Sequence, residues 1–593
     1  MSRSLFGVAP WVMLSMILIC LFVPTSDGSP SACPNEASTT HGPEALMVSH
    51  RMREELRTRL EAAGTPPQIS VGPASIRVSE MLPDFYARRM YQPAWSNDAG
   101  PLPHVDALLD ALHDAEREGL RSSDYQLAHI EATLGIVRDQ QAQQAALDPC
   151  NLVELDLQLT NAFFRYGTHV QDRRITPATI DAAKLINRRE VDLANVLQTA
   201  LDGNAVGDGL RSLVPQHPGY MRLRKALARY RDLAAKEGWP LVPEGQPLQK
   251  GTRSDRVVAL RTRLVVAGDL DPARSDDGRL FDEALEHAVR RFQWRHGLGA
   301  DGVVGPSTLA ALNVPVEARV RQLELNMERW RWLPQQLGDR HIRINIANFA
   351  LEVVEDGRPV LTMPVIVGRP DRPTPSFSAY MSHLVLRPYW QVPPSIAIAD
   401  KLPLFRKDPS YVTKQRFRIF PGWGAEGKPI DPHTIDWSQV SAHNFNYRLR
   451  QDPGPLNALG RVKFMLLNPF NVYLHDTPSR NLFSKPVRAL SSGCIRLADP
   501  IALAEYVLRD DHRWPREKIL DAIEHRTQHT VRLPEPIPVH LLYATAWVDE
   551  DGSIHFRQDI YDEDQALEQA LREERLLQEQ KDDHDPQGMP QAV

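Results

Sequence analysis

Apolar residues recur at three- and four-residue steps through much of the N-terminal part of the chain, a period that predicts amphipathic helices. One such stripe runs through Leu152, Leu155 and Leu159. The aromatic cluster within residues 81–95 has the composition of a sugar-binding platform, but ordinary helix core accounts for such clusters more often. We therefore predict a helical scaffold over residues 45–240, with no chemistry of its own.

A short stretch rich in proline and glycine, residues 239–247, reads as a linker. Apolar steps beyond it mark two helices, at Val257–Leu264 and Leu285–Phe292. A third begins at Pro306, since proline is tolerated in the first turn of a helix. The pattern predicts a small three-helix unit over residues 247–314.

The period changes to two near residue 338, where Ile342, Ile344 and Ile346 alternate with polar residues. Asp356-Gly357 then separates two apolar runs, which is a strong hairpin signal. More short apolar runs follow. We predict a mainly β domain over residues 338–535.

Three further segments depart from these patterns. Residues 397–452 are rich in Pro, Gly, Arg and Trp, and a connection this long in a compact domain is usually functional or disordered. For residues 536–562 we predict a C-terminal hairpin around an acidic turn. Residues 563–593 predict a charged tail, helical at first and solvated at its end.

The N-terminus carries a nearly continuous apolar run, Leu5–Val23, after the single basic residue Arg3. This predicts a secretory signal peptide or an uncleaved signal anchor over residues 1–33, and the sequence leaves the two open. Either one predicts export to the periplasm, with an inner-membrane tether if the segment is retained. No other apolar run has the length of a membrane span.

The composition of the chain bears on its binding partners and on its number of domains. The 593 residues carry a net charge of −6 with 24% charged residues, so nothing predicts a global cationic face for nucleic acid. The hydrophobic fraction of 42% and the length allow several domains, each with its own core. The fold class we predict is multidomain α+β.

Cysteine is scarce, with four in the chain. Cys20 lies in the apolar run, Cys33 and Cys150 can pair in an oxidising compartment, and Cys494 is left over. A lone cysteine is more often structural than catalytic. Its neighbours reverse that expectation here.

Cys494 lies in Ser491-Ser492-Gly493-Cys494-Ile495-Arg496, downstream of Tyr473-Leu474-His475-Asp476-Thr477. A thiol with a histidine nearby reads as a nucleophile with its base. Gly493 permits a sharp turn, and backbone N–H groups around it can stabilise an oxyanion. The strand pattern predicts His475 at a strand end and Cys494 just before a helix, whose N-terminus favours thiolate.

These motifs resemble the signature of the L,D-transpeptidases (the YkuD-type catalytic domain), in which a histidine precedes Ser-His-Gly-Cys. Ser492 stands where that motif most often has histidine, which leaves His475 as the base. Flanking stretches such as residues 387–396 and 454–460 resemble the large multidomain periplasmic branch. The resemblance implies a cap over the active-site cleft at residues 397–452.

The three-helix unit resembles the peptidoglycan-binding type 1 domain, whose motif residues occur here as Phe292-Gln293, Gly297-Leu298, Asp301-Gly302, Gly305 and Thr308-Leu309. Those residues mainly build turns and core. Whether the unit binds glycan or serves for docking stays open.

The resemblance implies a peptidoglycan L,D-transpeptidase that forms 3→3 cross-links between stem peptides through a Cys494 thioester, with His475 as base, no cofactor and no metal. It also implies acylation of Cys494 by carbapenems and, as further partners, other cell-wall synthesis enzymes. Gly493, Tyr473 and Ser492 are the expected oxyanion and supporting residues.

Two candidate substrate-binding residues stay open. Arg496 can bind a stem carboxylate or pair with Asp499. Trp390 can line the cleft or pack, with packing favoured. Asp476 follows His475 directly, and since adjacent strand residues point to opposite faces, a structural role is expected for it.

The sequence leaves several alternative functions open. Within the family they are attachment of proteins to the wall and L,D-carboxypeptidase activity; outside it, a non-catalytic wall-binding scaffold. A papain-like protease is disfavoured because its cysteine normally precedes its histidine. Zinc hydrolysis is disfavoured because no metal-ligand spacing appears.

Overall fold

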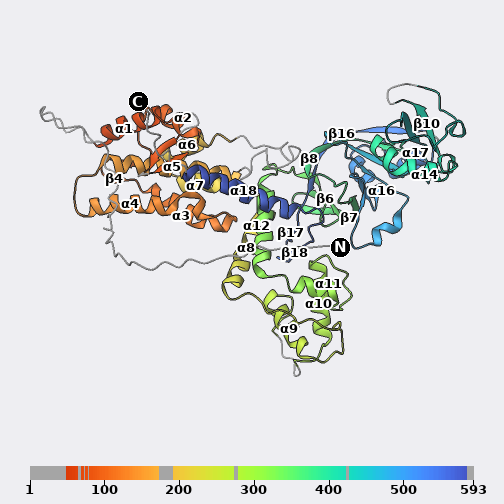
Figure 1. Cartoon of the computed structure of the whole chain (residues 1–593), viewed down its shortest axis with the longest axis horizontal. Helices are drawn as coiled ribbons and strands as arrows, with labels where there is room; N and C mark the ends of the chain where they lie inside the picture. Colours follow the sequence, from red (N-terminus) through yellow and green to blue (C-terminus); the bar gives the residue numbers. More distant parts are fainter. Residues whose placement is uncertain are drawn as a thin grey trace, which may run out of the picture.

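The computed structural model describes residues 48–64, 68–71, 74–77, 79–171, 191–272, 278–422, 427–525 and 527–583. The molecule is elongated, with a helical region at one end, a β domain at the other and a small helical unit beside the middle (Figure 1). The predicted signal segment, residues 1–33, lies outside the described residues. Among the described residues, no helix combines the length and apolarity needed to cross a bilayer.

The helical region is built around one long buried helix, α5, with shorter helices packed along it. Its helices are α1 (Val48–Glu61), α2 (Met81–Arg88), α3 (His104–His113), α4 (Leu127–Ala142), α5 (Pro149–Gln171), α6 (Leu193–Asp202), α7 (Val206–Leu213) and α8 (Pro218–Ala235). Two small hairpins accompany them, β1 (Gln68–Val71) with β2 (Ala74–Arg77) and β3 (Ser96–Asn97) with β4 (Gly100–Pro101). Phe85, Tyr86 and Trp95 of the aromatic cluster are buried in this core.

The core of the helical region extends beyond residue 240. Leu323 and Met327 of α12 (Val316–Arg331) belong to it. So do Ala546 of β17 (Ala546–Val548) and Phe556 of β18 (Ile554–Phe556), which pair as the C-terminal hairpin. One apolar core therefore joins the helical region to segments on both sides of the β domain.

The small helical unit consists of α9 (Asp255–Ala267), α10 (Glu283–Arg295) and α11 (Pro306–Leu312) around a separate core. The Gln293 amide donates to Asp301 Oδ1 at 2.8 Å and to the Val303 carbonyl at 2.9 Å, and it accepts from Gly302 N. Its motif residues thus hold the turn between α10 and α11. Arg295 donates to the Ile554 carbonyl, which ties the unit to the hairpin.

The β domain is a nine-stranded sheet of order β14-β7-β15-β13-β12-β8-β16-β5-β6, closed by a β6–β7 pairing. Its strands are β5 (Arg340–Asn345), β6 (Ala350–Glu355), β7 (Arg358–Gly368), β8 (Phe377–Leu386), β12 (Val462–Leu466), β13 (Leu474–His475), β14 (Ala489–Ser491), β15 (Ile495–Leu497) and β16 (His529–Leu542). Helices α16 (Pro500–Leu508) and α17 (Arg516–Glu524) add Leu503, Val507 and Ile519 to its core. The mixed α+β class predicted from the sequence is confirmed.

The long connection predicted as a cap is a small folded body. Its sheet has the order β10-β11-β9, with β9 (Trp390–Gln391), β10 (Phe417–Pro421) and β11 (Tyr447–Gln451). Its helical turns are α13 (Pro394–Ile396), the π turn Ala397–Lys401, α14 (Leu402–Lys407) and α15 (Tyr411–Lys414). The body has its own core, which includes Trp390, Phe405 and Trp437. The insertion thus begins at β9 and not at residue 397, because β9 pairs with β11.

The C-terminal segment is helical at first, as its sequence predicts, but this helix docks on the rest of the molecule. Helix α18 (Glu563–Asp583) returns to the helical region (Figure 1). Leu567 and Ala570 pack on Leu325 of α12, and Asp564 pairs with Arg329 at 2.5 Å. Burial of these two apolar side chains holds the helix against the molecule despite its polar composition. Residues 584–593 lie outside the described residues.

A buried carboxylate organises the helical region and generates a stability prediction. Asp156 on α5 is 0% exposed and accepts from Tyr86 Oη at 2.6 Å and from the backbone N–H groups of Ala94 and Trp95 at 2.8 and 2.9 Å. Since Asp156→Ala leaves the two backbone N–H groups without this acceptor, it should lower the free energy of unfolding of this region by about 3 kcal/mol. Asp110→Ala, an exposed change on α3, should cost less than about 0.5 kcal/mol in the same denaturant titration. Equal effects of the two substitutions would refute the organising role.

Candidate active site

The sheet brings the two sequence motifs side by side. Strands β13 and β15 pair in parallel, with His475 opposite Arg496 and Leu474 opposite Ile495. The Ile495 N–H donates to the Tyr473 carbonyl at 3.1 Å. Because side chains alternate across a sheet, Cys494, two residues before Arg496, and Tyr473, two before His475, lie on the same face as that pair.

A tight turn holds the nucleophile in place. Gly493 has φ +106°, a conformation that L side chains rarely adopt, so glycine is required there. Ser491 Oγ donates to the Cys494 carbonyl at 2.5 Å and accepts from Gly493 N at 3.2 Å. Thr374 Oγ1 donates to the Gly493 carbonyl at 2.7 Å. The carbonyls on both sides of the turn are therefore fixed by hydroxyl donors.

Ser492 connects this turn to the cap. Arg372 Nη1 donates to Ser492 Oγ at 3.2 Å and pairs with Asp400 in the π turn of the cap at 2.8 Å. Arg372 lies in the segment between β7 and β8, so three separate parts of the chain meet at one guanidinium. The position that departs from the common motif thus links the nucleophile turn to the cap.

The Cys494 thiol is partly buried and forms no disulfide bond. Burial raises its pKa, while hydrogen bonds from Tyr473 and the positive charges of Lys463 and Arg496 lower it, with burial dominant. Sγ itself lies 3.8 Å from the Asn471 carbonyl. The resting nucleophile is therefore a thiol that nearby groups are placed to ionise.

His475 is 5% exposed, and its Nδ1 lies 2.5 Å from the Asp476 carbonyl. A carbonyl only accepts, so Nδ1 carries the proton and Nε2 presents its lone pair. Burial, then the charge of Arg496, lowers the pKa of His475 to about 3. The imidazole is neutral at physiological pH and is able to accept a proton. Cys494 lies diagonally across the strand pair from it, a separation on the order of 7 Å between Cα atoms.

Three family models match this chain. They are a scaffold domain over residues 80–227, a "Putative peptidoglycan binding domain" over 253–312 and an L,D-transpeptidase catalytic domain over 339–523. Residues 339–523 form an L,D-transpeptidase catalytic domain. The resemblance seen in the Cys/His motifs is confirmed.

Among curated relatives, a "Putative L,D-transpeptidase" of Haemophilus influenzae is 34% identical over 252 residues, 42% of this chain and 49% of that protein. The chain thus spans about half of that relative. The N-acetylmuramoyl-L-alanine amidase CwlM of Mycobacterium tuberculosis is 41% identical over 80 residues, 12% of this chain and 20% of CwlM.

Among solved structures, residues 123–326 of the L,D-transpeptidase of Xylanimonas cellulosilytica are 18% identical to this chain. The match covers 51% of this chain and 99% of that one, with a TM-score of 0.17. Because this TM-score is low, the positions of the site residues are not compared between the two structures.

Lys463 is a residue of the transpeptidase domain that the sequence reasoning missed. It lies on β12 opposite His475, and its Nζ lies 3.8 Å from the centre of the Tyr473 ring. Burial lowers its pKa, and it forms no ion pair among the described residues; the thiolate of Cys494 is the negative charge that it would face. The alternation of residues 462–466 could have placed Lys463 on the face of the strand opposite Phe464. It could not have shown which strand would lie beside Lys463.

Arg496 is not paired with Asp499, one of the two roles left open for it. Asp499 instead caps α16 by accepting from Ala502 N at 3.0 Å. The Nε of Arg496 is buried without a partner, and its charge acts on both Cys494 and His475. Its guanidinium is therefore available to a carboxylate next to the nucleophile.

Trp390 packs within the cap. It is 7% exposed, lies over Phe417 at 6.2 Å between ring centres, and has Lys401 Nζ 5.5 Å from its ring. Tyr473 is partly buried against this same core. The Trp390 side chain also hydrogen-bonds Tyr473. Its predicted contact with substrate stays a prediction.

Asp476 holds the turn after His475. Its carboxylate accepts from Arg461 N and Thr477 N, both at 2.8 Å, and pairs with Arg480 at 3.1 Å. Gly460 lies against it, where a Cβ would come within 2.5 Å of the carboxylate. The Asp476 side chain therefore holds the backbone next to His475 in place and does not contact the His475 ring.

Two further expectations concern cysteine and metal. Cys150 is disulfide-bonded, but the predicted partner Cys33 lies outside the described residues, so that pairing stays a prediction. Within the described ranges, no group of three or more His, Cys, Asp or Glu side chains has the arrangement of a metal site.

The electrostatics of the site predict how Cys494 reactivity depends on pH. Because burial raises the thiol pKa and His475 stays neutral, the rate of alkylation by iodoacetamide should keep climbing with pH beyond the ordinary thiol value of about 8.5. Lys463→Met removes a positive charge and should slow alkylation at pH 8 by about threefold to tenfold. Lys250→Met, in the small helical unit, is the matched control.

The rate should be measured from pH 5 to 10 on full-length protein. A rate that is flat down to pH 5 would show a preformed thiolate–imidazolium pair and contradict the neutral resting state.

Proposed function

We propose that this protein is a peptidoglycan L,D-transpeptidase that forms 3→3 cross-links between stem peptides. The observation that carries the proposal is the shared face of β13 and β15 in an L,D-transpeptidase catalytic domain. This face carries a thiol, a neutral histidine and Arg496, whose Nε has no hydrogen-bond partner among the described residues. Cross-linking is favoured over wall attachment of proteins because the chain also carries a region matching a peptidoglycan-binding domain.

The first half-reaction acylates the sulfur. Cys494 Sγ bonds to the carbonyl carbon of the third stem residue, a diamino acid, and its proton passes to Nε2 of His475. The amide bond to the terminal D-alanine breaks, and the leaving amine takes that proton. A thioester and free D-alanine result, with the charge on the enzyme unchanged.

The second half-reaction transfers the acyl group. The side-chain amine of another stem attacks the thioester, the C–S bond breaks, and the amine's proton passes through His475 to the departing sulfur. The oxyanion of each tetrahedral intermediate needs nearby donors. At rest the Gly493 N–H is bonded to Ser491 and the Tyr473 hydroxyl to the Cys494 thiol, so both must change partner to serve, and the Cys494 N–H is the third candidate donor.

The cap supports transfer over hydrolysis. Its core packs on Tyr473, and Asp400 is joined to Ser492 through Arg372. A body held over the nucleophile in this way excludes water and leaves the thioester for an amine. The same thiol is the one that a carbapenem would acylate.

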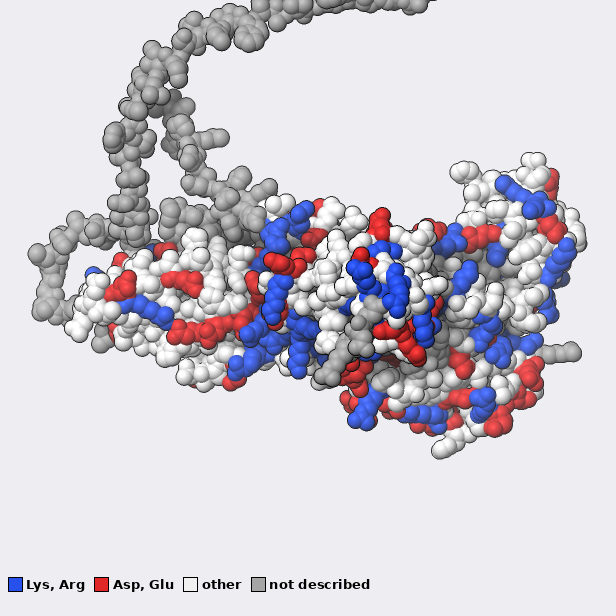
Figure 2. Space-filling view, turned by 90° about the horizontal axis from the view of Figure 1, so that it is seen from below, with Lys and Arg blue, Asp and Glu red and all other residues white. Residues whose placement is uncertain are grey.

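This function places the protein outside the cytoplasm, in the periplasm, where its wall substrate is found. The disulfide at Cys150 is in keeping with an oxidising compartment. On the face shown in Figure 2, basic and acidic side chains are interspersed, so that face offers no continuous basic surface for nucleic acid. Other cell-wall synthesis enzymes are the natural protein partners of such an activity.

The product assay for this proposal uses disaccharide-tetrapeptide with wild type, Cys494→Ala and His475→Ala, followed by mass spectrometry. Wild type should form a 3→3 dimer, and both substitutions should reduce it at least about a thousandfold. Tripeptide without dimer would identify an L,D-carboxypeptidase. No turnover with reduced Cys494 would favour protein attachment or a binding scaffold.

Arg496 should bind the terminal carboxylate of the donor stem. Arg496→Gln is expected to raise KM for the tetrapeptide donor about tenfold, because one charge-assisted contact is lost. Amidation of that carboxylate should remove most of the difference between wild type and variant. Arg513→Gln, an exposed change on the same domain, is the control. A KM penalty that persists on the amidated donor would assign Arg496 to packing or to thiol activation.

A further inference from the structure

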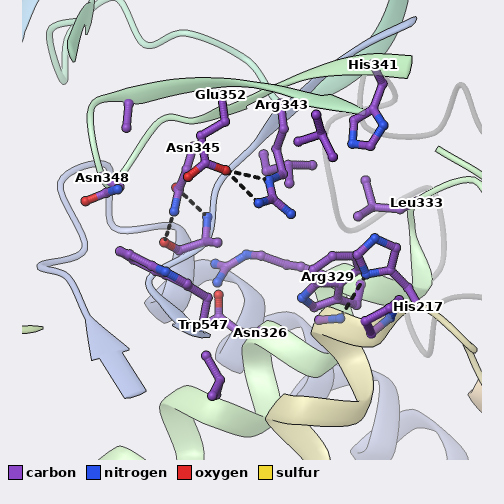
Figure 3. A pocket seen from close by; sticks show the side chains of 18 of the residues that line it. His217, Asn326, Arg329, Leu333, His341, Arg343, Asn345, Asn348, Glu352 and Trp547 are labelled. Carbon is purple, nitrogen blue, oxygen red and sulfur yellow. Dashed lines mark hydrogen bonds and ion pairs between the residues drawn. The ribbon is translucent and has the colours of Figure 1, made fainter. Parts of the chain in front are cut away.

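A cavity of about 730 Å³ lies between the helical region and the catalytic domain (Figure 3). Its walls come from the start of α8, the end of α12, strands β5 and β6, and the β17–β18 hairpin. None of the active-site residues Lys463, Tyr473, His475, Cys494 and Arg496 lines it. The cavity is thus a separate feature of the molecule, of a size typical of ligand sites.

Indole rings form part of the wall. Trp330, Trp332 and Trp547 line the cavity. Trp330 stacks on His217 with 4.4 Å between ring centres, and Trp547 stacks on His555 with 4.8 Å. Rings held flat by a stacked partner present a rigid apolar surface with polar edges, which suits a ligand with both apolar and polar faces.

Hydrogen-bond donors without partners outnumber free acceptors in the inner wall. His217 Nδ1 accepts from Gly219 N at 3.0 Å, so the neutral ring carries its proton on Nε2. Arg222 uses only Nε, on the Val548 carbonyl, and Asn348 uses only its oxygen, which accepts from Arg557. Among the described residues, no hydrogen bond uses the remaining N–H groups of these side chains or the Trp330 indole N–H.

Most of the inner acceptors, in contrast, are engaged. The exception among the histidines is His341 Nε2, which is left with a lone pair because Nδ1 donates to the Gly338 carbonyl, and it has no partner among the described residues. Glu352 pairs with Arg343 at 2.6 Å, and Asp549 accepts from the Trp547 indole N–H at 2.9 Å and pairs with His555 at 2.7 Å. Asn345 exchanges two hydrogen bonds with the Ala544 backbone. A ligand that fits this wall brings acceptor oxygens and needs few donors.

The rim restricts the charge of that ligand. Asp356, Glu550 and Asp551 lie exposed at the edge of the cavity. Arg358 is also exposed there, so three acidic side chains lie beside one basic one, and the net negative charge disfavours a nucleic acid or a polyphosphate. Carbonyl oxygens, together with at most a single carboxylate, meet both the donor-rich wall and the acidic rim.

We propose that this cavity binds a glycan–stem-peptide segment of peptidoglycan, with an N-acetyl sugar on the indole rings and its acetamido and peptide carbonyls on the free donors. This inference rests on the proposed function, which makes the wall the substrate. The site spans the helical region and the catalytic domain, so a strand bound there holds both in one orientation while a second stem enters the active site.

Photo-crosslinking tests the site on full-length protein. The probe is disaccharide-tetrapeptide with a diazirine on the sugar N-acyl group, and adducts are mapped by mass spectrometry of proteolytic peptides. Adducts are expected on peptides that contain residues 217–222, 326–332 or 547. Arg222→Met should reduce them about tenfold, since it removes the free donors and keeps the aliphatic stem.

Two further variants sharpen the test. Ala350→Phe adds a ring at a half-buried position of the cavity wall and should also reduce the adducts, without removing a native contact. Arg211→Met, an exposed change on α7, should leave them unchanged. Adducts that are absent from these peptides, or that survive both cavity variants at the wild-type level, would overturn the proposal.

Catalysis is scored separately. Cys494→Ala should keep the cavity adducts, and Arg222→Met should keep dimer formation from soluble tetrapeptide within about twofold of wild type. Cavity adducts without any dimer formation would refute the transpeptidase and keep the binding site. Dimer formation without cavity adducts would refute the site alone.

Discussion

The parallel pairing of β13 with β15 is the contact on which the candidate active site depends. It places His475 opposite Arg496 and, two residues back along both strands, Tyr473 beside Cys494. Neither motif carries this geometry by itself, because each contributes only a two- or three-residue strand. Their neighbours β12 and β7 supply the remaining ladder hydrogen bonds, so the position of the thiol depends on the closed sheet as a whole.

Burial sets the protonation states on that face. It raises the thiol pKa of Cys494 and lowers that of His475, so both groups are neutral at rest. The cations Lys463 and Arg496 oppose the first effect and reinforce the second. A substrate that brings a carboxylate to Arg496 would offset positive charge near His475 and ease its protonation. If Cys494 is acylated as proposed, its acylation would then depend on occupation of the site by a carboxylate.

The sequence was most informative where chemistry depends on local order. The Cys494 and His475 motifs, Gly493 with its positive φ and the change from a helical to a strand period near residue 338 are all local features. They were enough to predict the α+β class and the transpeptidase family. Signals of this kind survive because a nucleophile turn or a period-two strand needs particular residues at neighbouring positions.

What the sequence could not show depends on contacts between distant segments. Lys463 joins the site only through the register of β12 with β13, and the cap begins at Trp390 only because β9 pairs with β11. The charged C-terminal segment docks through Leu567 and Ala570, too few apolar positions to stand out in its composition. The cavity at Trp330 and Trp547 is likewise formed by segments more than two hundred residues apart.

The central claim is that Cys494 carries the acyl group as a thioester, and intact-mass spectrometry tests it most directly. Full-length protein is mixed with disaccharide-tetrapeptide whose acceptor amine is acetylated, so that transfer cannot follow, and is quenched in acid. The account predicts a mass gain equal to the donor minus D-alanine, located on the peptide that contains Cys494. An unmodified protein whose Cys494 is shown to be reduced, or an adduct on another residue, would contradict it.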